Sequence, residues 1–336
     1  MNLKINNPLW STILLLSPFF LWGTAMVAMK GVMPDTTPLF VASVRLLPAG
    51  FLVLLAAGLS GRSQVISGKG WLWISLFALV DGTLFQGFLA EGLARTGAGL
   101  GSVIIDSQPL AVALLSRWLF QEKIGLWGWL GLAVGIAGIS LIGLPDEWFY
   151  QLFSLAPQEI WSAIFTPSSP GAVFHLSGEG FMLLASLSMA IGTVLIRFVC
   201  READPVVATG WHMIIGALPL LALSWGWETQ TWQQISLTGW LNLGYATVFG
   251  SAIAYGVFFW LASRGNLTSL SALTFLTPVF ALSFGNLILG EVLSPLQGFG
   301  VGLTLISIYL INQRENLLEP LKRFGLLISP PVDSQP

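Results

Sequence analysis

Four side chains that can carry charge or exchange a proton stand inside otherwise apolar stretches: Arg45, Asp81, Asp106 and His212. An ionisable group in hydrocarbon is costly unless it is paired or faces water, so each is a candidate functional residue. Such groups are rare here, because only 9% of the 336 residues are charged while 54% are hydrophobic. An ordinary soluble domain carries roughly 25% charged residues. The composition therefore predicts an integral membrane protein.

Arg45 and Asp106 are predicted to lie at the same depth. Arg45 follows Pro38, the start of its apolar stretch, by seven residues, and Asp106 follows Gly99 by seven. At 1.5 Å per residue, both side chains lie roughly 10 Å below the same surface. Equal depth predicts a buried ion pair in which each partner keeps its charge. Such a pair could clamp a substrate, act as a gate that breaks during a conformational change, or be a fixed structural contact.

Asp81 lies about ten residues into its apolar stretch, near the membrane midplane, and no opposite charge is evident at that depth. Burial favours the uncharged carboxyl, which suits a proton carrier. The same group could capture a substrate ammonium, or donate a hydrogen bond to a helix carbonyl as a purely structural residue. His212 aligns with Arg45 when Pro205 is placed on Pro38. It could bind substrate, titrate near neutral pH, or be a neutral hydrogen-bonded residue.

Uncharged polar and aromatic side chains form a second set of candidates, since they orient small molecules without carrying charge into the membrane. They are Trp22, Gln86, Gln108, Tyr255 and Trp260. For each of them, packing against lipid or a neighbouring helix is the alternative role.

The sequence predicts no catalytic or metal site and no cofactor. His175 and His212 lie in different regions, Cys200 is the single cysteine, and no HExxH motif is present. No basic patch supports binding of nucleic acid. The expected partners are a small-molecule substrate, the lipid bilayer and a coupling ion such as a proton.

Apolar stretches cut at glycine, proline and charge clusters predict ten helices. Several reach about 20 residues, enough to cross roughly 30 Å of hydrocarbon, and their continuous apolarity excludes an outer-membrane barrel. The predicted helices span 10–29, 38–59, 71–94, 100–120, 126–144, 180–200, 205–225, 237–262, 267–289 and 296–312.

Residues 94–122 are repeated without a gap 169 positions later, at residues 263–291. The offset places one Arg, Ser, Pro and Glu of each copy on its counterpart: Arg95 on Arg264, Ser102 on Ser271, Pro109 on Pro278 and Glu122 on Glu291. Five crossings per copy is an odd number, so the second copy must enter the membrane from the opposite side. We therefore expect an all-α integral membrane protein of ten transmembrane helices in two inverted five-helix repeats. The expected units are residues 1–144, an extracytoplasmic linker over 145–179, residues 180–313 and a cytoplasmic tail over 314–336.

The Lys and Arg positions predict that both termini are cytoplasmic, because positive residues accumulate on that side. With the N-terminus inside, eleven of the fourteen lie on the cytoplasmic side, whereas only Lys30 and Arg95 face outward and Arg45 lies within a helix. The expected location is a bacterial-type plasma membrane or an organelle inner membrane.

Inverted repeats can exchange conformations, which opens a central site to alternate sides of a membrane. Positions where the copies differ mark the predicted substrate or proton site: Asp81 corresponds to Gly250 and Asp106 to Phe275. A static bundle that has merely been duplicated is the alternative.

Several motifs carry a resemblance to a known family: LWGTAMVAMK at 21–30, Arg45, and a proline followed thirteen residues later by glutamate in each copy. A glycine-rich helix follows each proline and glutamate, at 125–143 and 299–310. With these features the chain resembles the EamA-type transporters of the drug/metabolite transporter superfamily along all ten predicted helices. The resemblance implies a carrier with a central cavity, an exporter or exchanger driven by an ion gradient. Its substrate would be a small polar or amphipathic metabolite, amino-acid-like or drug-like. An intramembrane enzyme, a lipid-modifying protein and a non-transporting scaffold are the alternatives.

Overall fold

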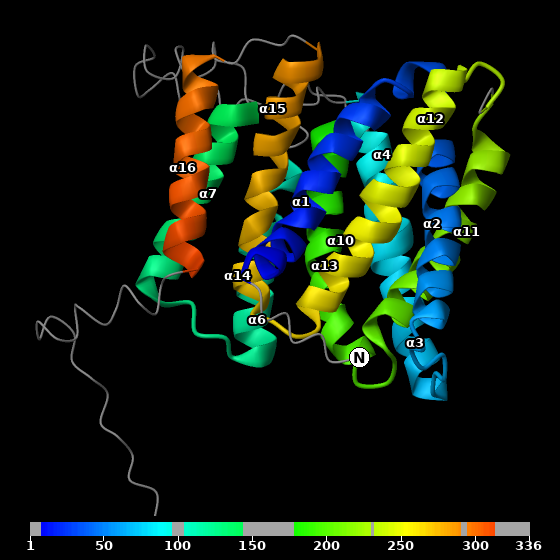
Figure 1. Ribbon diagram of the computed structural model, residues 1–336, viewed down its shortest axis with the longest axis horizontal. Coiled ribbons are helices and arrows are strands. Elements are labelled where there is room, and N and C mark those ends of the chain that lie inside the picture. The colour runs from blue at the N-terminus through cyan, green and yellow to red at the C-terminus, as the bar shows by residue number, and fades with distance from the viewer. Residues whose placement is uncertain (1–7, 96–103, 144–177, 230–231, 290–293, 313–336) are drawn as a thin grey trace, which may run out of the picture.

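A computed structural model describes residues 8–95, 104–143, 178–229, 232–289 and 294–312, and these form helices and short connections without a strand (Figure 1). Within these residues, six helices are long and apolar enough to cross a membrane. They are α1 (Pro8–Lys30), α2 (Pro38–Leu59), the continuous helix Gly68–Arg95, α10 (Gly178–Val199), α11 (Pro205–Trp227) and the continuous helix Leu237–Ala262. The prediction of an all-helical membrane protein is confirmed.

The other helices are shorter. They are α6 (Gln108–Phe120), α7 (Gly125–Gly143), α14 (Leu267–Ala272), α15 (Leu276–Leu289) and α16 (Pro295–Asn312), with 3-10 turns η1 (Met33–Asp35) and η4 (Leu273–Phe275). Helix α2 and the helix Leu237–Ala262 begin and end at the predicted residues. The predicted tail over 314–336, His175, Glu291 and the predicted linker as far as residue 177 lie outside the described residues.

Two of the long helices contain a π-helical segment near their middle. Helix Gly68–Arg95 consists of α3 (Gly68–Phe77), π-helical η2 (Ala78–Phe85) and α4 (Gln86–Arg95). Helix Leu237–Ala262 consists of α12 (Leu237–Tyr245), π-helical η3 (Ala246–Ile253) and α13 (Ala254–Ala262). π-Helical turns occur as short interruptions of α-helices, frequently at functional sites. Asp81 lies within η2.

Glycines bring α11 against both α2 and η2. A Cβ on Gly50 would lie 2.7 Å from the Gly210 carbonyl oxygen, and a Cβ on Gly216 would lie 2.5 Å from the Gly82 Cα. Since such distances leave no room for a side chain, the backbones approach more closely than ordinary helix packing allows. This close approach sets which residues of η2 and α11 face each other.

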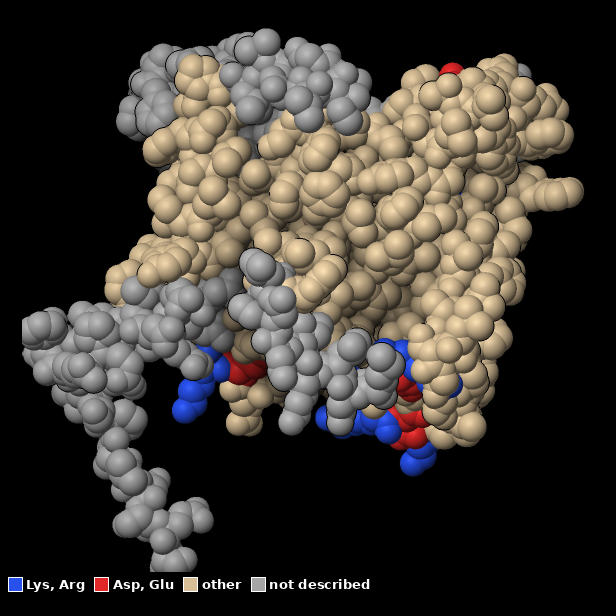
Figure 2. All heavy atoms as spheres, viewed as in Figure 1, with Lys and Arg blue, Asp and Glu red and all other residues tan. Residues whose placement is uncertain are grey.

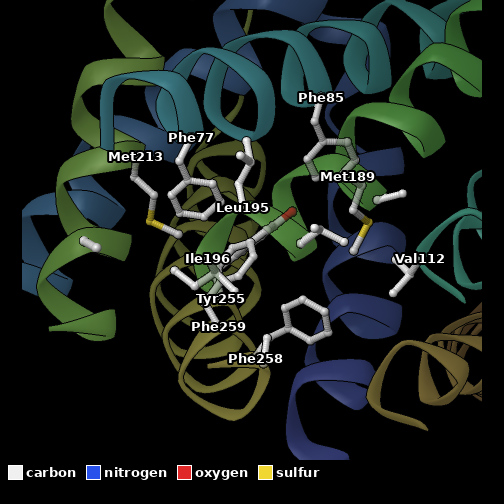
Figure 3. Close-up of a cluster of buried hydrophobic side chains, with 14 of the residues drawn as sticks. Phe77, Phe85, Val112, Met189, Leu195, Ile196, Met213, Tyr255, Phe258 and Phe259 are labelled. Carbon is white, nitrogen blue, oxygen red and sulfur yellow. The ribbon is translucent and has the colours of Figure 1, made fainter. Parts of the chain in front are cut away.

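The helices enclose a core of aromatic and methionine side chains, which includes Phe77, Phe258 and Phe259 (Figure 3). Large apolar side chains also cover the outside: Leu59 is 82% exposed and Trp225 is 88% exposed. Lys and Arg gather at the end of the molecule where α3 begins and α6 ends, the lower end in Figure 2. An apolar belt above a charged end is the surface expected of a protein embedded in a bilayer.

The carboxylate of Glu228, which follows α11, caps the start of α2. It accepts hydrogen bonds from the Leu39 backbone N–H at 2.9 Å, the Phe40 backbone N–H at 3.0 Å and the Thr37 hydroxyl at 2.9 Å. These groups lie in the first helical turn, where backbone N–H groups lack intrahelical partners and negative charge is favoured. The cap therefore ties the end of α11 to the beginning of α2.

Replacing Glu228 with glutamine should lower the stability of the protein by about 1–2 kcal/mol, because the charge is lost and one N–H acceptor becomes a donor. The measurement is the thermal unfolding midpoint in detergent. Glu91→Gln is the matched control, since the Glu91 and Arg95 side chains form an i,i+4 ion pair that is 22% and 48% exposed, a kind of pair worth little. Equal midpoints for both variants would contradict the capping role.

Candidate functional site

Arg45 of α2 is 5% exposed and is held by side chains from two other segments, α1 and α4. Its guanidinium donates hydrogen bonds to the side-chain oxygen of Gln86 and, at 3.3 Å, to the sulfur of Met29. The Gln86 amide in turn donates to the Tyr255 hydroxyl at 2.8 Å. A hydrogen-bonded chain therefore connects α2, α4 and α13 through the interior.

The predicted Arg45–Asp106 ion pair is absent, although both residues are described and both are buried. The guanidinium is directed to Gln86 and Met29, and the Oδ2 atom of Asp106 has no hydrogen-bond partner among the described residues. The prediction rested on equal depth, which would define only the position along the membrane normal. The lateral arrangement of the helices separates the two charges.

Asp81 and His212 do form a pair, which corrects the expectation that Asp81 has no partner at its depth. His212 Nε2 lies 3.1 Å from Asp81 Oδ2, and the two residues are 1% and 0% exposed. The contact of Gly82 with Gly216 places η2 directly against α11, so the two side chains meet. The sequence shows a glycine beside Asp81 and another one turn from His212, but it does not show that these two glycines meet.

Aromatic rings and a glycine enclose the Asp81–His212 pair. Phe77 stacks on the imidazole with ring centroids 4.1 Å apart, and Phe259 contacts it edge-on at 5.5 Å. On the other side, a Cβ on Gly192 of α10 would lie 2.4 Å from Asp81 Oδ1. Asp81 Oδ1 and His212 Nδ1 have no hydrogen-bond partner within the described part of the chain. The pair therefore has one unused acceptor and one unused ring nitrogen in a tightly packed enclosure.

A separate cavity of about 70 Å³ lies beside this enclosure and has room for a few water molecules. Four predicted site residues line it: Trp22, Arg45, Asp106 and Tyr255. Apolar side chains make up most of the remaining wall, including Met26, Met29, Phe85, Leu89, Ile105 and Met189. Asp81, His212 and Gln108 are outside the lining.

The cavity wall carries several polar atoms that have no hydrogen-bond partner among the described residues. They are Nε1 of Trp22, Nε of Arg45, Oδ2 of Asp106 and Oγ1 of Thr277. Buried polar groups are normally satisfied, so unsatisfied ones in a cavity indicate bound water or a ligand. These four atoms are two donors, one acceptor and a hydroxyl that can do either, and all belong to residues that line the cavity.

Gln108 has another position: its amide donates to the Thr193 hydroxyl at 3.2 Å and links α6 to α10. Thr277, which the sequence analysis missed, is the residue that corresponds to Gln108 at the offset of the repeat. The repeat itself was therefore the signal for Thr277. Among the described residues, no group of three or more His, Cys, Asp or Glu is placed to hold a metal ion.

Apolar helices long enough to cross a membrane, around a mostly apolar cavity that Arg45 and Asp106 also line, define an integral membrane protein with an internal cavity. The sequence profile of the EamA-like transporter family matches residues 9–144 and 176–313, and the chain belongs to that family. It is a membrane transporter.

Relatives agree with this assignment, and a solved structure shares the fold. The chain is 67% identical to an uncharacterized transporter of Synechocystis over 98% of both chains. It is 51% identical to a WAT1-related chloroplastic protein of Arabidopsis thaliana, over 89% of this chain and 68% of that one. A crystal structure with 16% sequence identity superimposes with a TM-score of 0.72, covering 93% of this chain and all of the other, which shows a shared fold.

Proposed function

We propose that this transporter exports or exchanges a small amphipathic metabolite with an anionic group and a cationic or donor group, as an amino acid has. The observation that carries the proposal is the cavity in which Arg45 and Asp106 face an otherwise apolar wall without pairing with each other. Arg45 supplies a charged donor for a carboxylate, and Asp106 supplies an acceptor for an ammonium or other donor. The methionine and aromatic wall suits an apolar portion of the same molecule.

Alternating access of two inverted five-helix repeats is the proposed mechanism. The family profile matches the chain twice, and the π-helical segments η2 and η3 occupy corresponding places in the two halves. The pairing of Gln86 with Tyr255 supports the same arrangement, because these residues correspond at the offset of the repeat. Repeats related in this way can exchange conformations about a central site.

The charged end of the molecule supports placing both termini in the cytoplasm. There, Glu122 at the end of α6 accepts hydrogen bonds from the Leu267 N–H at 3.2 Å and the Thr268 hydroxyl at 3.0 Å, at the start of α14. Arg197 of α10 lies 3.5 Å from the same carboxylate and donates to the Gly265 carbonyl. These contacts tie three helices together on the cytoplasmic side, which supports an outward-facing state.

Export is tested by comparing the metabolites released by cells that lack the protein with those released by cells that express it. We expect at least one amphipathic metabolite to accumulate outside several-fold more with the protein present. Asp106→Asn should abolish the difference, because the cavity loses its carboxyl group. Asp35→Asn, outside the cavity, is the matched control and should export normally. An unchanged set of released metabolites, or export by Asp106→Asn at the wild-type rate, would contradict the proposal.

A further inference from the structure

We propose that the Asp81–His212 pair is the proton-binding site that drives this transport, separate from the substrate cavity; the inference rests on the function proposed above. The pair joins two helical segments in the interior and is inaccessible to solvent in this state. It also leaves Asp81 Oδ1 and His212 Nδ1 without a hydrogen-bond partner among the described residues. A contact that served only to pack η2 against α11 would not need two titratable groups, because the glycines already bring the backbones together.

The charge of the pair depends on one proton. With one labile proton, the pair is neutral overall, either as carboxylate and imidazolium or as carboxylic acid and imidazole. Without that proton, a carboxylate and a neutral imidazole remain, and the enclosure contains an uncompensated negative charge. Such a charge is strongly disfavoured in a dry interior, so a closed enclosure requires the proton, and release of the proton favours an open, hydrated one.

The elements packed around the Asp81–His212 pair bring few charged or titratable groups to it. Segment η2 contributes Asp81 itself and α11 contributes His212. Helix α10 contributes Gly192, which is uncharged, and α13 contributes Tyr255, whose hydroxyl interacts electrostatically with both Asp81 and Arg45. Arg45 on α2 is a buried positive charge that is linked to Tyr255 through Gln86. Within the described residues, no other charged side chain reaches the enclosure.

The chain Arg45–Gln86–Tyr255 provides the route from the substrate to the proton site. A substrate carboxylate that binds Arg45 competes with Gln86 for the guanidinium, and Gln86 holds the Tyr255 hydroxyl. The Tyr255 hydroxyl accepts from Gln86 and keeps its own proton free, so when Gln86 moves the hydroxyl can turn, donate to Asp81 and stabilise the deprotonated carboxylate. Substrate binding then expels a proton, and proton binding expels substrate. One proton enters the cytoplasm from outside for each substrate molecule exported.

Proton binding is tested first without substrate, on the full-length protein in lipid nanodiscs with ¹⁵N-labelled histidine. The chain has two histidines, so His175→Gln leaves His212 as the single labelled imidazole. We expect its ¹⁵N resonances to change with pH as the pair gains its proton on either partner, and Asp81→Asn to alter that response. Resonances of His212 that do not respond to pH would overturn the proposal.

Coupling is tested in proteoliposomes that are given a deproteinised small-molecule extract of the expressing cells. A gradient of one pH unit should drive about tenfold accumulation of the transported metabolite by the wild type if one proton moves per molecule. Asp81→Asn and His212→Gln should lower this ratio to about one, yet still exchange labelled for unlabelled metabolite. Thr209→Val, which removes a buried hydroxyl one turn from His212 on the same helix, is the matched control and should accumulate normally.

The outcomes separate the two proposals. If the wild type exchanges metabolite but does not accumulate it under a pH gradient, the proton site is wrong and the transport function stands. Accumulation by both variants at the wild-type ratio also overturns the proton site. If the wild type moves no metabolite from the extract, the proposed function itself fails. Should both variants fail to fold, the titration of His212 and the accumulation ratio of the wild type decide.

Discussion

Arg45→Gln is expected to reduce transport at least about 100-fold while the protein still folds. The substitution removes the charged donor of the cavity, and charge-assisted hydrogen bonds contribute about 1.5–3 kcal/mol each. Loss of about 3 kcal/mol corresponds to more than a hundredfold in rate or affinity. Folding should survive because glutamine is shorter, neutral and able to bond to the Gln86 amide. The measurement is export of the metabolite identified by the comparison of released metabolites, normalised to the amount of protein in the membrane.

Arg117→Gln is the matched control for this prediction, since it makes the same chemical change at an exposed position near the end of α6. It should retain export within about twofold, as expected for a surface substitution. Export by Arg45→Gln at a rate similar to that of Arg117→Gln would exclude Arg45 from substrate binding. Loss of monodisperse protein in Arg45→Gln alone would instead show that the Arg45–Gln86–Tyr255 chain is required for the fold.

Gly216→Val is expected to prevent stable folding. Its Cβ would lie 2.5 Å from the Gly82 Cα and 2.8 Å from the Ala78 carbonyl oxygen, and these are backbone atoms that cannot rotate away. Separating η2 from α11 to make room would also break the Asp81–His212 contact. Overpacking of this kind exceeds the usual cost of about 1–3 kcal/mol, because two helices must move apart. The measurements are the yield of monodisperse protein in detergent and its thermal midpoint.

Gly226→Val provides the control in the same helix, because no atom lies within 4 Å of a Cβ placed at Gly226. Both substitutions replace glycine with valine in α11, so the loss of backbone freedom in the unfolded chain is about the same. It should give monodisperse protein with little change in the midpoint. If Gly216→Val were also tolerated, the close approach of η2 and α11 would not be a requirement of the fold.

The position of the membrane helices could be predicted from sequence because lipid leaves few options. A spanning segment must satisfy its backbone hydrogen bonds internally, so an apolar stretch of sufficient length becomes a helix. This constraint explains why α2 and the helix Leu237–Ala262 begin and end as predicted. It also explains why the buried ionisable residues were recognised, since Arg45, Asp81, Asp106 and His212 are all at most 6% exposed.

Partners across the bundle could not be predicted in the same way. Counting residues from a helix end gives depth, and depth alone suggested Arg45 with Asp106 although the structure pairs Asp81 with His212. Lateral proximity depends on which helices touch, which is set by local backbone contacts such as that of Gly82 with Gly216. The π-helical turn of η2 adds to the difficulty, because it alters the direction of Asp81 and leaves no mark in the pattern of apolar residues.

The two π-helical segments have a mechanical consequence. A π-helical turn contains about one residue more than an α-helical turn, and this surplus residue can be passed along a helix by exchanging one hydrogen bond at a time. Each step would rotate the residue that it passes by about 100°, the angle that one residue occupies in an α-helix. Side chains along η2 and η3, including Asp81, could thus change the direction in which they point without any backbone group losing its partner in lipid. A π-helical segment in each half therefore lets the transporter change shape by exchanging backbone hydrogen-bond partners. This exchange avoids the cost of breaking those hydrogen bonds inside the bilayer.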